Sequence, residues 1–279
     1  MIVNPLSPVM GAEVRGVDLS RPLDEAAFGQ ILDAFHRHMV LVFREQRIDE
    51  AQQVAFSRRF GELQIHVLEQ YRHSRYPEIY VLSNVDAGTD RTTGTHPDKG
   101  TLVWHSDLSF LPRPALATAL YGIEVPDEGG DTLFADMCGA YDALDRETKK
   151  LLEKLKAVHD IDVSRRRAGE APMTARQRAE APPVEHPTVR THPATGRKVL
   201  YVSRHASHVV GLPRAESDAL LERLQAHATS GRFVYRHRWR ARDLVIWDNR
   251  CTMHCATPYD AGAERRVIHR TVVKGDAPF

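Results

Sequence analysis

The chain has 279 residues, 42% of them hydrophobic, which is enough for one large domain with a sizeable core or for two small ones. Its 38 basic and 37 acidic residues give a net charge of +1, so the chain as a whole lacks the electrostatic footprint of a nucleic-acid-binding protein. Three cysteines are too few for a secreted disulfide scaffold, and the sequence contains neither the pattern of a signal peptide nor an apolar run of membrane length. We therefore expect a cytoplasmic protein without nucleic-acid or membrane partners.

Helices and strands alternate in the first part of the chain. Asp24 is a candidate N-cap of a helix with Phe28, Ile31, Leu32 and Phe35 on one face, and residues 40–43 have the pattern of a buried strand. Asp49 is predicted to begin a second helix, which ends by Gly61.

A strand over residues 79–82 precedes a segment, 86–100, that is rich in Gly, Thr, Asp and Pro. Long loops of this kind are often lids, so we expect a mobile loop there. The polar, Arg-rich and Pro-rich segment 164–187 is expected to be a second mobile excursion.

Strands dominate the second half. A strand is predicted over 116–125, a turn at Gly129-Gly130, and a helix from Asp145 to about Leu155 with Leu151, Leu152 and Leu155 as its apolar stripe. A second helix covers about 215–228, and further strands cover 198–202, 233–239, 244–247 and 267–273. This arrangement indicates a mostly β protein with flanking helices, a jelly-roll barrel that occupies residues 1–279 as a single domain.

Two His-x-Asp motifs are candidate metal-ligand pairs, because side chains two residues apart on a strand point to the same face. His96-Pro97-Asp98 lies in the predicted loop and contains a proline, whereas His105-Ser106-Asp107 follows residues 102–104, which have strand character. The second motif is the better candidate. Either motif alone is weak evidence, and with 15 histidines in the chain residue type does not select a third ligand.

Other clusters have simpler structural interpretations. Cys251 and Cys255 bracket His254, but a structural zinc site needs four well-spaced ligands, so we interpret them as small buried side chains. We interpret His205 and His208 as a hydrogen-bonding cluster on a loop that borders a pocket. Trp239 and Trp247 are expected in the core, and the run 165–167 of three arginines on a solvated face.

Four motifs in order resemble a known family: Trp104-His105-Ser106-Asp107, Gly129-Gly130-Asp131-Thr132, Trp247-Asp248-Asn249-Arg250, and the run from His254 to Arg270. With Gly61-Glu62-Leu63, they are similar to the taurine dioxygenase and 2,4-dichlorophenoxyacetate dioxygenase family over nearly the whole chain. The resemblance implies an Fe(II)- and 2-oxoglutarate-dependent oxygenase on a double-stranded β-helix, the cupin-like jelly roll. It also implies a homo-oligomer that uses O2.

The resemblance assigns roles to individual residues. His105, Asp107 and His254 match the iron ligands, the two-His-one-carboxylate set that leaves one face of the metal open. Arg266, rather than its neighbour Arg265, matches the arginine that binds the remote carboxylate of 2-oxoglutarate, with Thr132 as a hydroxyl donor to the same group. Arg270 matches the arginine that reaches the anionic group of the primary substrate, and His66 matches a histidine near the substrate pocket.

Three further segments are similar to the 2,4-dichlorophenoxyacetate branch: residues 190–192, 205–209 and 233–239. They imply an aryloxyalkanoate substrate, whereas segment 66–99 departs from that branch and leaves taurine, an alkylsulfonate or an alkyl sulfate as alternatives. A cupin-like binding protein or isomerase would not need Arg266 and Thr132 together. A regulatory protein that had lost its metal would be expected to lack a ligand, and none is missing.

Overall fold

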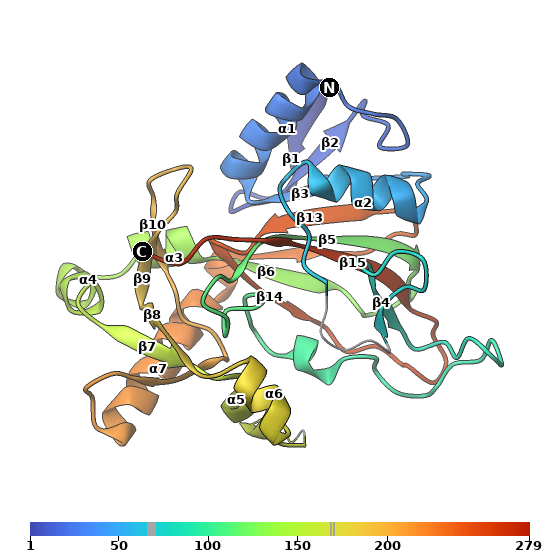
Figure 1. Cartoon of the computed structure of the whole chain (residues 1–279). Coiled ribbons are helices and arrows are strands. Elements are labelled where there is room, and N and C mark those ends of the chain that lie inside the picture. The colour runs from blue at the N-terminus through green and yellow to red at the C-terminus, as the bar shows by residue number, and fades with distance from the viewer. Residues whose placement is uncertain (66–70, 168, 170) are drawn as a thin grey trace.

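Two facing β-sheets form the centre of the molecule (Figure 1). The computed structural model describes residues 1–65, 71–167, 169 and 171–279. The larger sheet has the strand order β1 (Ile2–Pro5), β2 (Ala12–Arg15), β3 (Val40–Phe43), β13 (Leu244–Asp248), β5 (Ala115–Glu124), β15 (Val267–Lys274) and β4 (Tyr80–Ser83). The smaller sheet has the order β12 (Val234–His237), β6 (Thr132–Asp136) and β14 (Thr252–Ala256). The predicted jelly roll with flanking helices is confirmed.

The larger sheet is buried on both faces, which explains why its central strands read as continuous apolar runs. On β13, Val245 and Trp247 face the smaller sheet and pack with Phe134 and other residues of the inner core. Leu244 and Ile246 alternate with them and face the opposite side. The metal-site candidates lie between the two sheets.

Helices α1 (Glu25–His38) and α2 (Glu50–Arg58) cover the outer face of the larger sheet (Figure 1). Asp24 and Asp49 cap them as predicted, each accepting a hydrogen bond from a backbone N–H three residues later. Phe28, Ile31 and Phe35 are buried on α1. These two helices close the outer core and leave the space between the sheets free for the site.

An insertion separates the paired strands β6 and β12 and packs beside the barrel (Figure 1). Its helices are α3 (Met137–Asp142), α4 (Arg146–Leu152), α5 (Ile161–Arg167), α6 (Ala175–Glu180), α7 (Arg214–Ala228) and the 3₁₀ helix η3 (Gly231–Phe233). Its strands form a sheet of β11 (Ala206–Val209), β7 (Lys156–His159) and β8 (Val184–Pro187), and a hairpin of β9 (Val189–Thr191) and β10 (Lys198–Leu200).

Four local predictions are corrected by the structure. Segment 164–187, expected as an irregular excursion, contains the end of α5, all of α6 and β8, so local hydrogen bonding and capping order a polar sequence. Residues 102–104 form no strand, because the 3₁₀ helix η2 (Lys99–Leu102) runs into them. Leu151 is 47% exposed, so only Leu152 is buried on α4. Residues 206–208 lie on β11 rather than on a loop.

No helix in the described ranges is both long enough and apolar enough to cross a membrane.

Candidate metal centre

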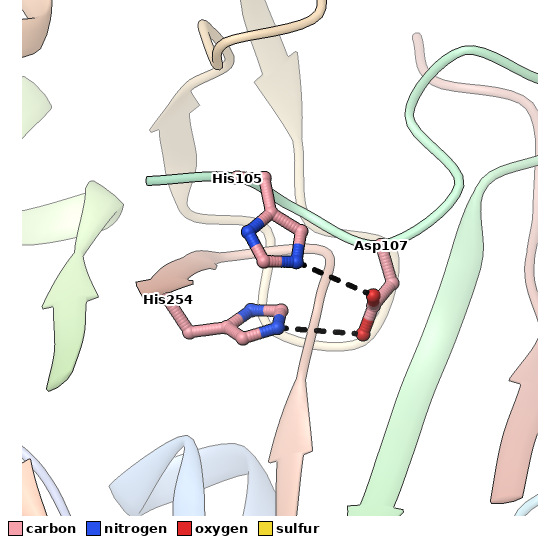
Figure 2. Close-up of side chains that lie close together, drawn as sticks. All are labelled: His105, Asp107 and His254. Carbon is pink, nitrogen blue, oxygen red and sulfur yellow. Dashed lines mark ion pairs between the residues drawn. The ribbon is translucent and has the colours of Figure 1, made fainter. Parts of the chain in front are cut away.

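Two segments distant in sequence bring His105, Asp107 and His254 together. His105 lies outside the named strands but pairs with His254 of β14 through two backbone hydrogen bonds, of 2.9 Å from His105 N to His254 O and 2.8 Å in return. Asp107 follows two residues later. Figure 2 shows the two imidazole rings and the carboxylate pointing toward one another. His105-Ser106-Asp107 therefore lies beside the third candidate ligand, His254, although residues 102–104 form no strand.

The three side chains have the spacing of a metal site. Nε2 of His105 lies 3.7 Å from Oδ1 of Asp107, and Nε2 of His254 lies 3.6 Å from Oδ2. The ligand atoms of all three residues lie within 4.8 Å of one another. An ion bound at about 2.0–2.2 Å can bridge ligand atoms up to about 4 Å apart. All three side chains are buried, and together they could hold one metal ion.

Neighbouring groups fix the orientation of the carboxylate and of one imidazole. Thr118 of β5 donates a 2.7 Å hydrogen bond to Oδ2 of Asp107, and Asn249 donates one of 2.9 Å to the Thr118 hydroxyl. The Asn249 side-chain oxygen also accepts from the backbone N–H of Asp107. Nδ1 of His105 lies 2.8 Å from the Val103 carbonyl, so it carries the proton and leaves Nε2 free as a ligand atom.

The electrostatics of the cluster favour ligand-competent protonation states. Burial lowers the pKa of His105 below its ordinary value, and burial together with the neighbouring His105 lowers the pKa of His254 to about 3. Burial alone would raise the pKa of Asp107, but Arg270 and the two imidazoles outweigh it and hold that pKa well below its usual range. Two neutral imidazoles and one carboxylate are the forms that bind a metal.

A pocket beside the triad contains two buried arginines and a threonine. Arg266, Arg270 and Thr132 line it together with His254. No carboxylate within the described ranges pairs with Arg266, and burial lowers its pKa to about 10. Nη1 of Arg270 lies 3.7 Å from Oδ1 of Asp107, and its guanidinium lies over the Tyr80 ring at 5.2 Å. A buried cation without a counter-ion is costly, so this pocket is suited to an anion.

The Thr132 hydroxyl can donate a hydrogen bond to a ligand in the pocket. The indole Nε1 of Trp239 donates a 3.0 Å hydrogen bond to Oγ1 of Thr132, and because an indole N–H is only a donor, the hydroxyl acts as acceptor in this contact. Its own hydrogen stays available for an anion in the pocket. Trp239 and Trp247 are buried as expected, but both also contact the site, since the Trp247 ring lies 4.6 Å from that of His254.

A second buried group of possible ligands consists of His192, Asp248 and Cys251. The Asp248 carboxylate in this group is already engaged by Arg250 and His192. Arg250 donates to both oxygens of Asp248, at 2.8 Å and 2.6 Å, and His192 Nε2 lies 3.0 Å from Oδ2. We interpret this group as a hydrogen-bonded ion-pair network that stabilises the turn after β13. All three cysteines are free and buried, as expected for Cys251 and Cys255.

The remaining candidates have mixed outcomes. His66 lies outside the described residues. Nδ1 of His205 forms a 2.9 Å hydrogen bond with the Ser109 hydroxyl, and the ring lies 6.3 Å from that of His105, so the predicted hydrogen-bonding cluster is present beside the site. Thr118 and Asn249, which orient Asp107, are site residues without a predicted role. Asn249 lies in the motif Trp247-Asp248-Asn249-Arg250, which is the one sequence signal for either residue.

A family model described as "Taurine catabolism dioxygenase TauD, TfdA family" matches residues 2–272. The chain belongs to this family. The expected resemblance is thereby confirmed, and the protein is a dioxygenase, an enzyme of the oxidoreductase class.

Relatives and solved structures in this family match almost end to end. The chain is 42% identical to an alpha-ketoglutarate-dependent 2,4-dichlorophenoxyacetate dioxygenase of Cupriavidus pinatubonensis, covering 99% of each chain. It is 36% identical to an (S)-phenoxypropionate/alpha-ketoglutarate-dioxygenase of Sphingobium herbicidovorans, covering 98% of this chain and 95% of the relative. The crystal structure of AAD-2 in complex with Mn(II) and N-oxalylglycine superposes with a TM-score of 0.88 at 36% identity and covers 99% of each chain.

Proposed function

We propose that this protein is an Fe(II)- and 2-oxoglutarate-dependent dioxygenase that hydroxylates a small anionic substrate, an aryloxyalkanoate such as 2,4-dichlorophenoxyacetate. One observation carries the proposal. Two neutral imidazoles and a carboxylate converge on one point, beside a pocket that contains two buried guanidinium groups. The imidazoles and the carboxylate suit a divalent metal, and the two guanidinium groups suit two anions.

His105, Asp107 and His254 would hold the iron, through Nε2 of each imidazole and the Asp107 carboxylate. The donor set fits, since two imidazoles and one carboxylate with open positions are typical of non-haem Fe(II) oxygenases. Fe(II), when bound, would supply open coordination positions for a 2-keto acid and O2 and would activate O2, the oxidant, for hydroxylation. Thr118 and Asn249 keep the Asp107 carboxylate in place, and the Val103 carbonyl sets the His105 ring.

Arg266 and Thr132 would bind the far carboxylate of 2-oxoglutarate. The Arg266 guanidinium can grip a carboxylate with two parallel hydrogen bonds, and the free Thr132 hydrogen adds a third. Asn84 positions the arginine, because its side chain accepts from the backbone N–H of Arg266 at 2.7 Å and donates to the Ala261 and Glu264 carbonyls. By contrast, Arg265 is engaged with Glu124 and Asp90 at the surface.

Arg270 would bind the substrate anion and orient its carbon toward the metal. In an aryloxyacetate the carbon between the carboxylate and the ether oxygen is the one to be hydroxylated. Transfer of one oxygen atom from O2 to that carbon, while 2-oxoglutarate takes up the other and becomes succinate and CO2, gives a hemiacetal. The hemiacetal collapses to a phenol and an oxoacid. Taurine, alkylsulfonates and alkyl sulfates offer an anion of similar charge and remain the alternative substrates.

The test is a substrate panel. The protein is supplied with Fe(II), 2-oxoglutarate and, in turn, phenoxyacetate, 2,4-dichlorophenoxyacetate, taurine and hexyl sulfate, and succinate and phenol are measured. We expect the aryloxy acids to stimulate succinate formation and to release one phenol per succinate. Arg270→Ala should lower kcat/KM for these acids by about a hundredfold or more, since a buried charged partner is lost. The exposed Arg37→Ala is the matched control and should leave it unchanged.

The outcomes separate the parts of the proposal. Efficient turnover of taurine or hexyl sulfate with inert aryloxy acids would contradict the substrate assignment and leave the oxygenase intact. Absence of succinate with every anion would contradict the proposed activity itself. A cytoplasmic location, suited to three free thiols, and a homo-oligomeric state complete the proposal.

A further inference from the structure

The other His-x-Asp motif, His96-Pro97-Asp98, lines the pocket, although it is part of neither group of possible metal ligands in the described ranges. His96 and Asp98 line the pocket together with Arg266 and Thr132. Two buried polar atoms in this region, Nε2 of His96 and the hydroxyl of Tyr259, have no hydrogen-bond partner within the described ranges, and neither has Nε of Arg266. Buried polar groups are nearly always paired in native proteins, so three unpaired ones side by side point to a ligand.

His96 presents a hydrogen-bond donor. The backbone N–H of Asp98 donates a 3.1 Å hydrogen bond to Nδ1 of His96, so Nδ1 is the acceptor nitrogen. In a neutral imidazole the proton is then on Nε2. Burial, and then the neighbouring Arg266, lower the pKa of His96, which keeps the ring in this neutral form. The unpaired Nε2 is therefore an N–H group without an acceptor.

Tyr259 presents a second donor beside it. Its ring lies 5.5 Å from the His96 ring and 6.0 Å from the Arg266 guanidinium carbon. Burial raises the pKa of Tyr259, so the phenol stays protonated. The backbone N–H of Gly130 donates a 3.3 Å hydrogen bond to the carbonyl of Pro258, the residue before Tyr259. A Cβ at Gly129 would lie 2.3 Å from that same oxygen. The Gly-Gly turn thus allows the segment of Tyr259 to lie close to it and the Tyr259 ring to lie beside His96 and Arg266.

These groups define the chemistry of their ligand. A guanidinium and an imidazole N–H can only donate, and a protonated phenol can donate beside them, so the group that all three bind must be an acceptor, and Arg266 requires it to be anionic. The pocket carboxylate of Asp98 does not fill this role, because the three donor atoms have no hydrogen-bond partner within the described ranges, and Oδ1 of Asp98 accepts from the backbone N–H of Gly100 at 2.9 Å instead. We propose that His96 Nε2–H and the Tyr259 hydroxyl donate hydrogen bonds to the far carboxylate of 2-oxoglutarate beside Arg266. This inference rests on the proposed function.

The test measures binding rather than turnover. The protein loaded with Mn(II) is titrated by calorimetry with N-oxalylglycine, which has a far carboxylate, and with oxalate, which has only the metal-binding end. His96→Leu and Tyr259→Phe should each weaken N-oxalylglycine binding about tenfold or more, because a hydrogen bond to a charged group is lost. Oxalate binding should not change. His96→Gln, with an amide N–H that can replace Nε2–H, should stay within about threefold of the original affinity.

Tyr201→Phe is the matched control. Its hydroxyl is also buried and unpaired within the described part of the chain, but Tyr201 lines a separate pocket, whereas Tyr259 contacts His96 and Arg266, so N-oxalylglycine affinity should not change in this variant. Unchanged N-oxalylglycine affinity in both His96→Leu and Tyr259→Phe would overturn the inference, and so would an equal loss for oxalate. An unmodified protein that binds oxalate but not N-oxalylglycine would overturn the proposed function together with this inference.

Discussion

His159 is a buried imidazole that the proposed chemistry does not use. Its ring stacks on Tyr201 at 5.5 Å and meets His186 edge-on at 5.1 Å. Neither ring nitrogen has a hydrogen-bond partner among the residues described. Burial, and then His186, lower the pKa of His159 to about 3. The folded protein therefore holds this ring neutral under conditions in which an exposed histidine would be charged.

This depressed pKa predicts acid sensitivity. The unfolded chain protonates His159 as the pH falls below about 6.5, whereas the folded chain resists until about pH 3, so stability is lost as the pH falls through this window. At pH 5 the loss from this residue is on the order of 2 kcal/mol. In urea unfolding of the metal-free protein at pH 7 and pH 5, His159→Phe should reduce the difference in the free energy of unfolding by about that amount. An undiminished difference in the variant would contradict the assignment.

Individual site residues were predictable to different degrees. The complete ligand triad and the choice of Arg266 over Arg265 came from the resemblance to the family's motifs, and the structure places the triad together and Arg266 in the pocket. The position of His96 Nε2 depends instead on how one loop folds, and no spacing reports that. Thr118 of β5 acts through a hydrogen bond to Asp107, which lies in a turn outside the strands, so only the tertiary fold identifies it.

At the scale of elements, the Gly129-Gly130 turn gives a sharp prediction. Gly129 and Gly196 both have positive φ angles, +76° and +70°, so alanine should cost about 1–2 kcal/mol at either position. A Cβ at Gly196 meets nothing within 4 Å, whereas at Gly129 it meets the Pro258 carbonyl at 2.3 Å. Gly129→Ala should therefore lower the free energy of unfolding by at least about 1 kcal/mol more than Gly196→Ala, the typical cost of overpacking. Equal losses in urea unfolding would argue against the close approach.

Elements with their own local signals were predicted well. Asp24 and Asp49 cap their helices because capping is a local interaction. Residues 102–104 have strand character, but Leu102 ends the 3₁₀ helix η2 and strand-like pairing begins only at His105, opposite His254. The polar segment 164–187 folds through caps and tertiary contacts, such as the Asp162 carboxylate that accepts from the backbone N–H of Met173. Composition alone does not reveal such contacts.

At the scale of the whole molecule, the insertion between β6 and β12 closes one side of the barrel and places His205 beside the metal centre. Apolar runs predicted the strands, but they could not predict this packing, since the order of strands in a sheet is not a local property. The larger sheet also needs α1 and α2 to cover its outer face.

The central claim is that His105, Asp107 and His254 form the metal site of this dioxygenase, and a metal titration tests it most directly. Calorimetry with Mn(II) should give one site per chain in the unmodified protein and no measurable site in His254→Ala or Asp107→Ala. Cys251→Ser, in the other buried group of possible ligands, should bind the metal like the unmodified protein. Metal binding that survives in His254→Ala, or that disappears in Cys251→Ser, would contradict the account.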